Sequence, residues 1–279
     1  MRQAHSYLKG LEGKSGDDPI ACSSSEGQET DPLAAMSVRE VKAAKLWMRD
    51  DAGKVEVAVK AAYDLARRAD PLELPPVQTL QRIIDKTNVK KQGGADHVTA
   101  GFLKLLPPEA VADLHTMFHN SIRVLALPWQ ILCTIMALIP KPENRGERAI
   151  AILSFFYRLL IRQFRPILAD WEEGLGAFRD SAIRGSSALR AALSRLVLDE
   201  ISIEKGEAII ALLWDMASFY DTIAWPALLE KCASKGYPPQ LLVLGLLAHL
   251  APRVLRSNGA CSRMIFPTTG VAAGCVQAT

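Results

Sequence analysis

The sequence has few aromatic residues, few cysteines and little net charge. Aromatic side chains make up 6% of its 279 residues, so the core must be mainly aliphatic. The five cysteines form no Cys-x-x-Cys pair and no Cys/His cluster at zinc spacing, which excludes a disulfide-rich mini-protein and indicates reduced thiols. Hydrophobic residues reach 49%, which excludes a wholly disordered or collagen-like chain. The net charge of +3 is too small to indicate a polyanionic partner by itself.

The sequence also lacks a secretory leader and a long apolar run. Its first residues include Arg2, His5 and Lys9, with no apolar block among them. The longest apolar run, 124–139, is interrupted by Pro128 and is shorter than the roughly 20 residues that a membrane helix needs. We therefore expect no membrane partner and a nuclear or cytoplasmic location.

Charge is distributed unevenly along the chain. Residues 1–36 hold three basic and six acidic side chains, a net charge of −3, and their Ser- and Gly-rich composition predicts a disordered acidic tail. The remainder, 37–279, therefore carries +6, the difference between +3 and −3. Ala-rich helical patterns predict a helical N-terminal extension over 37–93.

Hydrophobic periodicity, prolines and turn residues predict the elements of the chain. The predicted helices are 38–68, 77–87, 99–105, 108–125, 154–171, 187–200, 226–234 and 239–250. The predicted strands are 131–139 and 149–153, which form a hairpin, 208–215, and a second hairpin of 253–256 and 261–266 around Asn258-Gly259. The sequence therefore mixes helices with a few short strands.

The strongest local feature is segment 212–225, LLWDMASFYDTIAW. An apolar run ends in Asp215, and Asp221 follows directly after Tyr220. A buried strand that ends in a carboxylate suits phosphoryl transfer, because Mg²⁺ prefers hard oxygen ligands and two such ions can hold the attacking and leaving oxygens. The alternative is that Asp215 only caps the helix that follows it.

Basic residues supply a second and a third candidate feature. Lys141 and Arg148 lie on a Pro-flanked hairpin, where cations could bind a triphosphate or a nucleic-acid backbone; a solvated turn is the alternative that this segment alone favours. Residues 121–195 hold eleven basic side chains, ten of them Arg, against six acidic ones. Arg suits phosphate recognition, and a solvated helix face explains the run equally well.

Taken in order, six segments resemble the front part of the reverse transcriptase of non-LTR (LINE-type) retrotransposons. They correspond to the segment that leads into the domain, two fingers motifs, a linking Gly-Phe-Arg segment, motif A with its helix, and the approach to motif B. The segments are GADHVTAGFLKLLP (94–107), LPWQILCTIMALIPKP (127–142), ERAIAILSFFYRLL (147–160), GLGAFRDSAIRGSSALRAAL (174–193), LLWDMASFYDTIAWPALLEKCASKGYPPQLL (212–242) and NGACSRMIFPTTGVAAGCVQAT (258–279).

The resemblance implies a fold and a domain division. Residues 94–279 resemble a partial reverse transcriptase domain, made of the fingers and the early palm. The implied fold class is α/β (α+β), helix-rich, with a small antiparallel sheet. Residues 37–93 then form an extension in front of this domain.

The resemblance also implies roles for the residues around motif A. Asp215 matches the catalytic aspartate that holds the metal ions, and the backbone of Met216 lines the same site. Tyr220 matches the aromatic residue that disfavours a 2′-hydroxyl on the incoming nucleotide. Asp221 matches a second aspartate with a structural role.

Further roles follow for residues on either side of motif A. Lys141 and Arg148 match fingers cations that face the template or the triphosphate. Gly270, Gly274 and Gln277 lie where motif B contacts the nascent base pair and the template. The implied partners are an RNA template, a DNA primer and deoxynucleoside triphosphates, and the implied cofactor is Mg²⁺, which Mn²⁺ can replace.

The implied activity is that of an RNA-directed DNA polymerase, which adds deoxynucleotides to a primer 3′-end by two-metal phosphoryl transfer. The sequence departs from the family pattern at Ala149, where Pro is usual, at Arg158, where Lys is usual, and at the displaced Gln277. No Tyr/Phe-x-Asp-Asp motif follows motif B, so we expect the chain to be inactive alone.

Two alternatives remain open at the level of sequence. The chain could be a non-catalytic relic that at most binds RNA or DNA through its Arg-rich face. It could also be a helical scaffold with chance matches, which predicts a helix instead of a strand over 208–215.

Overall fold

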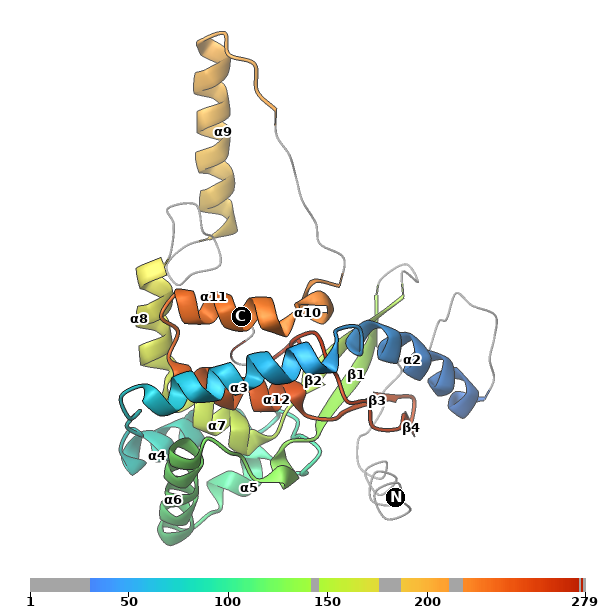
Figure 1. Cartoon of the computed structure of the whole chain (residues 1–279), viewed down its shortest axis with the longest axis vertical. Coiled ribbons are helices and arrows are strands. Elements are labelled where there is room, and N and C mark those ends of the chain that lie inside the picture. The colour runs from blue at the N-terminus through green and yellow to red at the C-terminus, as the bar shows by residue number, and fades with distance from the viewer. Residues whose placement is uncertain (1–30, 142–145, 176–186, 211–217, 276, 278–279) are drawn as a thin grey trace. The chain divides into compact units, whose positions relative to one another are not determined.

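A computed structural model describes residues 31–141, 146–175, 187–210, 218–275 and 277 of the chain (Figure 1). The chain divides into two compact units, Met1–Gln163 with Tyr220–Thr279, and Phe164–Phe219. Each unit is described by itself. Within the described ranges, none of the helices combines the length and the apolar character needed to cross a membrane.

The larger unit begins with two helices where one was predicted. They are α2 (Pro32–Trp47) and α3 (Ala52–Arg68). The Asp51 carboxylate caps α3 by accepting a hydrogen bond from the Lys54 N–H at 2.9 Å, so the chain breaks between the two helices. Asp31 caps α2 in the same way, which starts this helix inside the segment predicted as tail.

Most of the other helices of this unit follow the predicted ranges closely, but no helix was predicted over 219–222 and the one predicted over 154–171 is shorter in the structure. The other helices are α4 (Val77–Lys86), α5 (Ala100–Lys104), α6 (Pro108–Val124), α7 (Phe155–Gln163), α10 (Phe219–Thr222), α11 (Trp225–Ser234) and α12 (Pro239–Leu250), with a short 3₁₀ turn at Trp129–Ile131. The predicted helix 154–171 was wrong in its extent. It ends at Gln163 because Pro166 has no N–H to donate to the carbonyl of Arg162.

A four-stranded sheet of order β2-β1-β3-β4 forms the centre of the larger unit. Its strands are β1 (Thr134–Pro140), β2 (Glu147–Ile152), β3 (Arg253–Ser257) and β4 (Ala260–Cys261). Both predicted hairpins are confirmed, and the β3–β4 turn has Asn258 and Gly259 at positive φ. The prediction of an antiparallel sheet was wrong, because β1 and β3 pair in parallel through the long connection between them.

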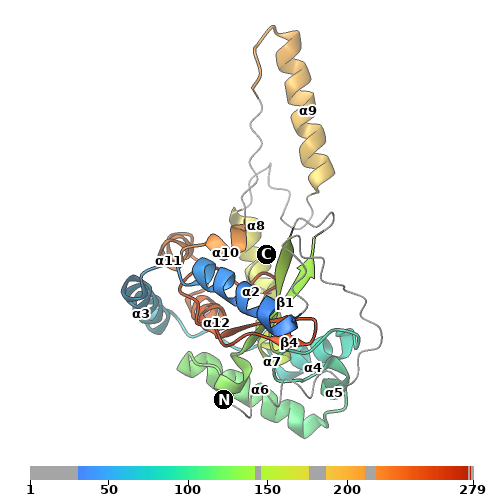
Figure 2. The same cartoon turned by 90° about the vertical axis from the view of Figure 1, so that its right-hand side faces the viewer.

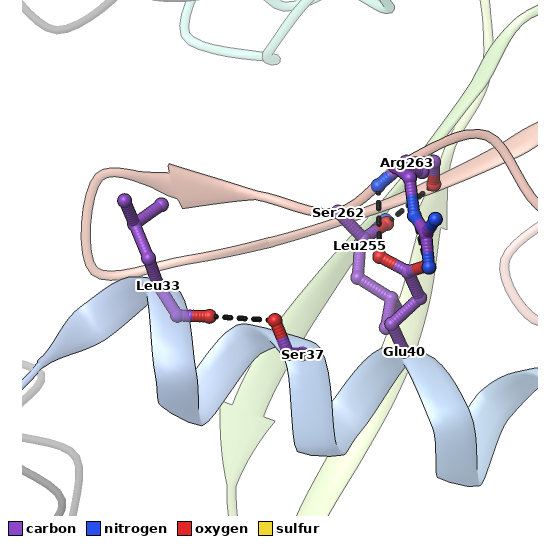
Figure 3. A network of polar contacts seen from close by, with 6 residues as sticks. All are labelled: Leu33, Ser37, Glu40, Leu255, Ser262 and Arg263. Carbon is purple, nitrogen blue, oxygen red and sulfur yellow. Dashed lines mark hydrogen bonds and ion pairs between the residues drawn. The ribbon is translucent and has the colours of Figure 1, made fainter.

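Helix α2 contacts both edges of this sheet. Arg39 makes two hydrogen bonds of 2.8 and 2.9 Å to the carboxylate of Glu147 on β2. The next residue, Glu40, accepts hydrogen bonds from the backbone N–H and the side chain of Arg263, just beyond β4 (Figure 3). Consecutive residues of a helix point in different directions, so two neighbours reach the two opposite edge strands.

A core cluster lies between α3, α11 and α12, which lie side by side in Figures 1 and 2. It is aliphatic apart from Trp225, as the low aromatic content predicted, and its buried members are Val55, Ala62, Ala66, Leu125, Trp225, Leu229, Leu242, Val243 and Leu246. Helix α3 lies in the predicted extension, and α11 and α12 lie in the predicted domain. The two segments therefore share one core.

The smaller unit contains α8 (Arg165–Leu175) and α9 (Ala188–Glu204). Ser187 caps α9, and the Glu207 N–H bonds to the Ser202 carbonyl at its end. The strand predicted over 208–215 is not present in 208–210, which have neither strand nor helix. Residues 211–215 lie outside the described residues.

Gly94 lies where the first and third segments of the family resemblance meet. A Cβ atom on Gly94 would lie 2.7 Å from the backbone nitrogen of Ser154. The Ser154 hydroxyl donates a hydrogen bond of 2.5 Å to the carboxylate of Asp96 and accepts one from the N–H of Phe156. Residues 94–96 and 153–156 therefore pack with no room for a side chain at Gly94.

We expect Gly94→Ala to lower the free energy of unfolding by about 2 kcal/mol or more, because rigid backbone must move to admit the methyl group. Gly101→Ala is the matched control, since its Cβ would meet only the Thr99 hydroxyl at 3.8 Å. That control should leave the stability within about 0.5 kcal/mol of the parent protein. Urea denaturation of both variants measures the difference, and equal midpoints would contradict the close packing.

Candidate functional site

Two segments that are distant in the sequence lie against each other next to the sheet. The Val271 N–H donates to the carbonyl of Tyr220 at 2.8 Å, and the Gly270 N–H donates to the carbonyl of Ile223 at 2.9 Å. The Thr269 hydroxyl donates to the same Ile223 carbonyl at 3.0 Å. The pair of segments 220–223 and 268–271 is called the crossing below.

Gly270 is required at the crossing for two reasons. Its φ of +80° is one that residues with a side chain rarely adopt. A Cβ atom there would also lie 2.7 Å from the carbonyl oxygen of Asp221. The glycine therefore permits the backbones of the two segments to approach.

Trp47, the last residue of α2, contacts both segments of the crossing. Its indole N–H donates to the Asp221 carboxylate at 2.7 Å, and its carbonyl accepts from the N–H groups of Thr268 and Thr269 at 2.7 and 3.0 Å. The side chain is only 2% exposed. Arg49 adds a hydrogen bond of 2.9 Å to the Thr222 carbonyl.

Arg253, the first residue of β3, is a buried charged residue that contacts the crossing. Its guanidinium carbon lies 4.8 Å from the centre of the Trp47 ring, and its Nη2 donates to the Gly270 carbonyl at 2.6 Å. The Trp225 indole donates to the same carbonyl at 3.1 Å. Burial lowers the pKa of Arg253 to about 10, and the negative charge of Asp221 opposes this shift. Nε and Nη1 of Arg253 have no hydrogen-bond partner among the described residues.

His249 anchors the next residues of the same segment. Its Nδ1 accepts a hydrogen bond of 3.1 Å from the N–H of Ala272, which assigns the ring proton to Nε2. Burial, and after it the charge of Arg253, lowers the pKa of His249 to about 3. The ring is therefore neutral near pH 7.

After Ala272 the chain runs beside β2 and then toward the interior of the protein. The Ala151 N–H of β2 donates to the Ala273 carbonyl at 2.7 Å, and Gly274 follows with a φ of +98°. A Cβ atom on Gly274 would contact the Ala151 carbonyl oxygen at 3.2 Å. Segment 270–274 therefore connects the crossing to the hairpin that carries Arg148.

Gln277 lies with its side chain inside the protein. Its Oε1 accepts from the Tyr157 hydroxyl at 2.8 Å, and its Nε2 donates to the Tyr237 hydroxyl at 3.1 Å and to the Leu241 carbonyl at 3.0 Å. A Cβ atom on Gly245 of α12 would clash with Oε1 of Gln277. The amide is bonded at both ends, so its expected contact with a template is replaced by contacts within the protein.

The hairpin holds the two predicted fingers cations next to the segment that joins β1 to β2. Arg148 is exposed on β2 opposite Ile139, and Lys141 follows β1 with its N–H bonded to the Gly146 carbonyl at 2.8 Å. Glu147, the residue before Arg148, is bonded to Arg39. Both cations are thus attached to a strand pair that α2 braces.

The Arg-rich face predicted on helix 154–171 is interrupted. Arg158 donates to the Gln92 carbonyl at 2.8 Å and lies 3.8 Å from the centre of the Phe155 ring. Burial, and after it the charge of Arg162, lowers the pKa of Arg158 to about 10, against the effect of Asp96. Arg158 is therefore held by the protein instead of forming part of a solvated face.

Of the predicted site residues, the structure brings together Tyr220, Asp221 and Gly270. Gly274 lies against β2, which carries Arg148, and Gln277 points inward. Asp215 and Met216 lie outside the described residues. The described part of the chain has no group of three His, Cys, Asp or Glu side chains that could hold a metal ion, and one oxygen of Asp221 is bonded to Trp47. Asp221 thus joins its segment to the end of α2.

The sequence analysis missed Trp47 and Arg253. Trp47 ends an Ala-rich helix and belongs to no motif, so nothing local indicates its role. Arg253 interrupts a long apolar stretch, and a lone charge in such a stretch is a usable signal of a buried, partnered cation.

Comparison with known proteins adds no relative to this picture. No protein-family model matches the chain, and no curated protein matches its sequence.

The first prediction for the site concerns Gly270. We expect Gly270→Ala to lower the free energy of unfolding by about 3 kcal/mol or more, because a positive φ costs about 1–2 kcal/mol and the contact with Asp221 adds to it. Gly146→Ala is the control, with a φ of +92° and no atom within 4 Å of the new Cβ. It should cost only the conformational part, about 1–2 kcal/mol. Chemical denaturation of both variants gives the difference, and equal losses would argue against the close approach.

The second prediction concerns pH. The folded-state pKa of His249, about 3, lies below its unfolded value of about 6.5, so the unfolded state binds the proton first as pH falls. Stability is therefore complete above about pH 6.5 and decreases below it, by at most about 1.4 kcal/mol per pH unit for this group. His249→Asn offers an acceptor to Ala272 without titrating. As the pH is lowered from 7.5 to 5, the denaturation midpoint of the parent protein should fall, and that of the variant should change less. Parallel curves would show that His249 is not the titrating group.

Proposed function

We propose that the chain is the fingers and early palm part of an RNA-directed DNA polymerase of the non-LTR retrotransposon class. The crossing is the observation that carries the proposal. It joins residues 220–223, from the motif A resemblance, to residues 270–271, from the motif B resemblance. The Val271 N–H bonds to the Tyr220 carbonyl at 2.8 Å and the Gly270 N–H to the Ile223 carbonyl at 2.9 Å. The same segment continues to β2, where the exposed Arg148 lies. Residues assigned to one nucleotide site thus come from three parts of the chain.

The proposed reaction is attack of a primer 3′-hydroxyl on the α-phosphate of a deoxynucleoside triphosphate, with pyrophosphate leaving. The Tyr220 carbonyl accepts a hydrogen bond from Val271. The side chain of Tyr220 would contact the sugar and disfavour a 2′-hydroxyl. Lys141 and Arg148 would attract the phosphates of template or nucleotide. Gly270 would let the base pair approach the backbone. Such a protein would meet its RNA template in the nucleus or the cytoplasm.

Asp215, with the backbone of Met216, would hold Mg²⁺ or Mn²⁺ in this proposal. When bound, the ion would supply stabilisation of the charge that develops on the phosphate oxygens. Asp221 is hydrogen-bonded to Trp47, and the proposal does not make it a metal ligand.

Binding without catalysis is the second candidate. The exposed position of Arg148 on the β1–β2 hairpin favours it. Its Arg-rich face would exclude Arg158, which is held by Gln92 and Phe155, so the cations of the β1–β2 hairpin are the better candidates for phosphate contacts.

Primer extension on poly(rA)/oligo(dT) with Mg²⁺ separates the two candidates. Template-dependent incorporation that Asp215→Ala abolishes would identify a polymerase. Salt-dependent binding of the hybrid without incorporation would identify a binding protein.

Binding of the same hybrid tests the role of Arg148 under either candidate. We expect Arg148→Ala to weaken binding several-fold and to reduce the slope of log K against log salt by about 1, because one phosphate contact is lost. Arg67→Ala, which removes the same charge from an exposed site on α3, is the control. Fluorescence anisotropy at several salt concentrations measures both quantities. Equal slopes for the two variants would remove Arg148 from the interface.

A further inference from the structure

Trp47 lies in the segment that the sequence assigns to an extension outside the polymerase-like domain, yet it contacts both segments of the crossing. It uses three different groups to do so. The indole N–H bonds to Asp221, the carbonyl bonds to Thr268 and Thr269, and the ring face lies against Arg253. At 2% exposure, these contacts are made in the protein interior.

The placement of Tyr220 depends on these contacts. Tyr220 belongs to α10, which has four residues. A helix of this length has almost no stability of its own, because its nucleation cost is not repaid by further hydrogen bonds. Its position must therefore come from tertiary contacts, and α2 and the residues just after it supply the Trp47 bond to Asp221 and the Arg49 bond to the Thr222 carbonyl.

The second segment of the crossing depends on the same residue. The Trp47 carbonyl holds two successive N–H groups directly before Gly270. The ring holds Arg253, which in turn donates to the Gly270 carbonyl at 2.6 Å. One residue, through its side chain and its carbonyl, thus contacts both backbones whose separation defines the crossing.

We propose that Trp47 is a positioning residue that sets the place of Tyr220 relative to Gly270, and that α2 is part of the nucleotide site. The consequence for the nucleotide rests on the proposed function. The positioning itself rests on the contacts of Trp47 alone.

Hydrogen exchange tests the positioning without any ligand. Trp47→Phe keeps an aromatic face for Arg253 and loses the N–H that bonds to Asp221. We expect the amides of Gly270 and Val271 to exchange about tenfold faster or more, because a hydrogen bond to a charged partner is lost. The amides of α12 should be unchanged, which distinguishes local loosening from global destabilisation.

Two variants and one control support this measurement. Asp221→Ala removes the acceptor and should give the same loosening, whereas Asp221→Asn keeps an acceptor oxygen and should stay within about threefold of the parent protein. Trp129→Phe, at a tryptophan that is 75% exposed, is the control and should change nothing. Unchanged exchange at Gly270 and Val271 in both Trp47→Phe and Asp221→Ala would overturn the proposal.

Nucleotide selection tests the functional consequence. A dideoxy-terminated DNA primer on an RNA template is bound by the chain, and the next complementary deoxy- or ribonucleoside triphosphate is added. We expect the preference for the deoxynucleotide, read as the gain in complex lifetime, to fall about threefold or more in Trp47→Phe. Binding without nucleotide should be unaffected.

The outcomes separate the two proposals. If the parent protein prefers the deoxynucleotide and Trp47→Phe prefers it equally, the positioning role is wrong. If the parent protein gains no lifetime from either nucleotide, the proposed polymerase function fails, and hydrogen exchange still decides the role of Trp47.

Discussion

The hydrogen bond from the Trp47 indole to the Asp221 carboxylate joins residues 174 positions apart, and the candidate site depends on it. A bond to a carboxylate from a buried donor is stronger than one between neutral groups, because little water competes for it. The bond places Asp221, and Asp221 places the four residues of α10. The carbonyl of Tyr220 in α10 then accepts a hydrogen bond from the N–H of Val271. Trp225 belongs to the core between α3, α11 and α12 and also donates a hydrogen bond to the Gly270 carbonyl, so it links this core to the site.

The elements of the fold were predictable where a local signal was strong. Helices α6, α11 and α12 each have a proline in the first turn and follow their predicted ranges, and the Asn258-Gly259 turn defines the β3–β4 hairpin. Two predicted helices are each divided in the structure, because an Ala-rich run conceals the cap at Asp51 and because Pro166 interrupts an otherwise continuous amphipathic pattern. The parallel pairing of β1 with β3 could not be predicted, since the choice of a distant partner strand depends on packing and not on the strand's own sequence.

The residues of the candidate site likewise include some that the sequence predicted and some that it did not. Tyr220, Asp221 and Gly270 were predicted from the order of the six segments that resemble reverse transcriptase motifs. The roles of Trp47 and Arg253 arise only when distant segments meet, so no window of the sequence contains them. Gln277 shows a further limit. Its position in the sequence favours an outward contact, but the hydroxyl groups of Tyr157 and Tyr237 satisfy its amide inside the protein, and the absence of a side chain at Gly245 leaves room for it.

The two ion pairs of α2 have a consequence for the order in which the chain folds. Arg39 bonds to a partner 108 residues away, whereas its neighbour Glu40 bonds to one 223 residues away. During synthesis the β1–β2 hairpin emerges long before β3, so the pair of Arg39 with Glu147 can form while half of the sheet is still missing. The pair of Glu40 with Arg263 must wait for β3 and β4, and closing such long loops is slow. During synthesis, the partner of α2 on one edge of the sheet is therefore present well before the partner on the other edge.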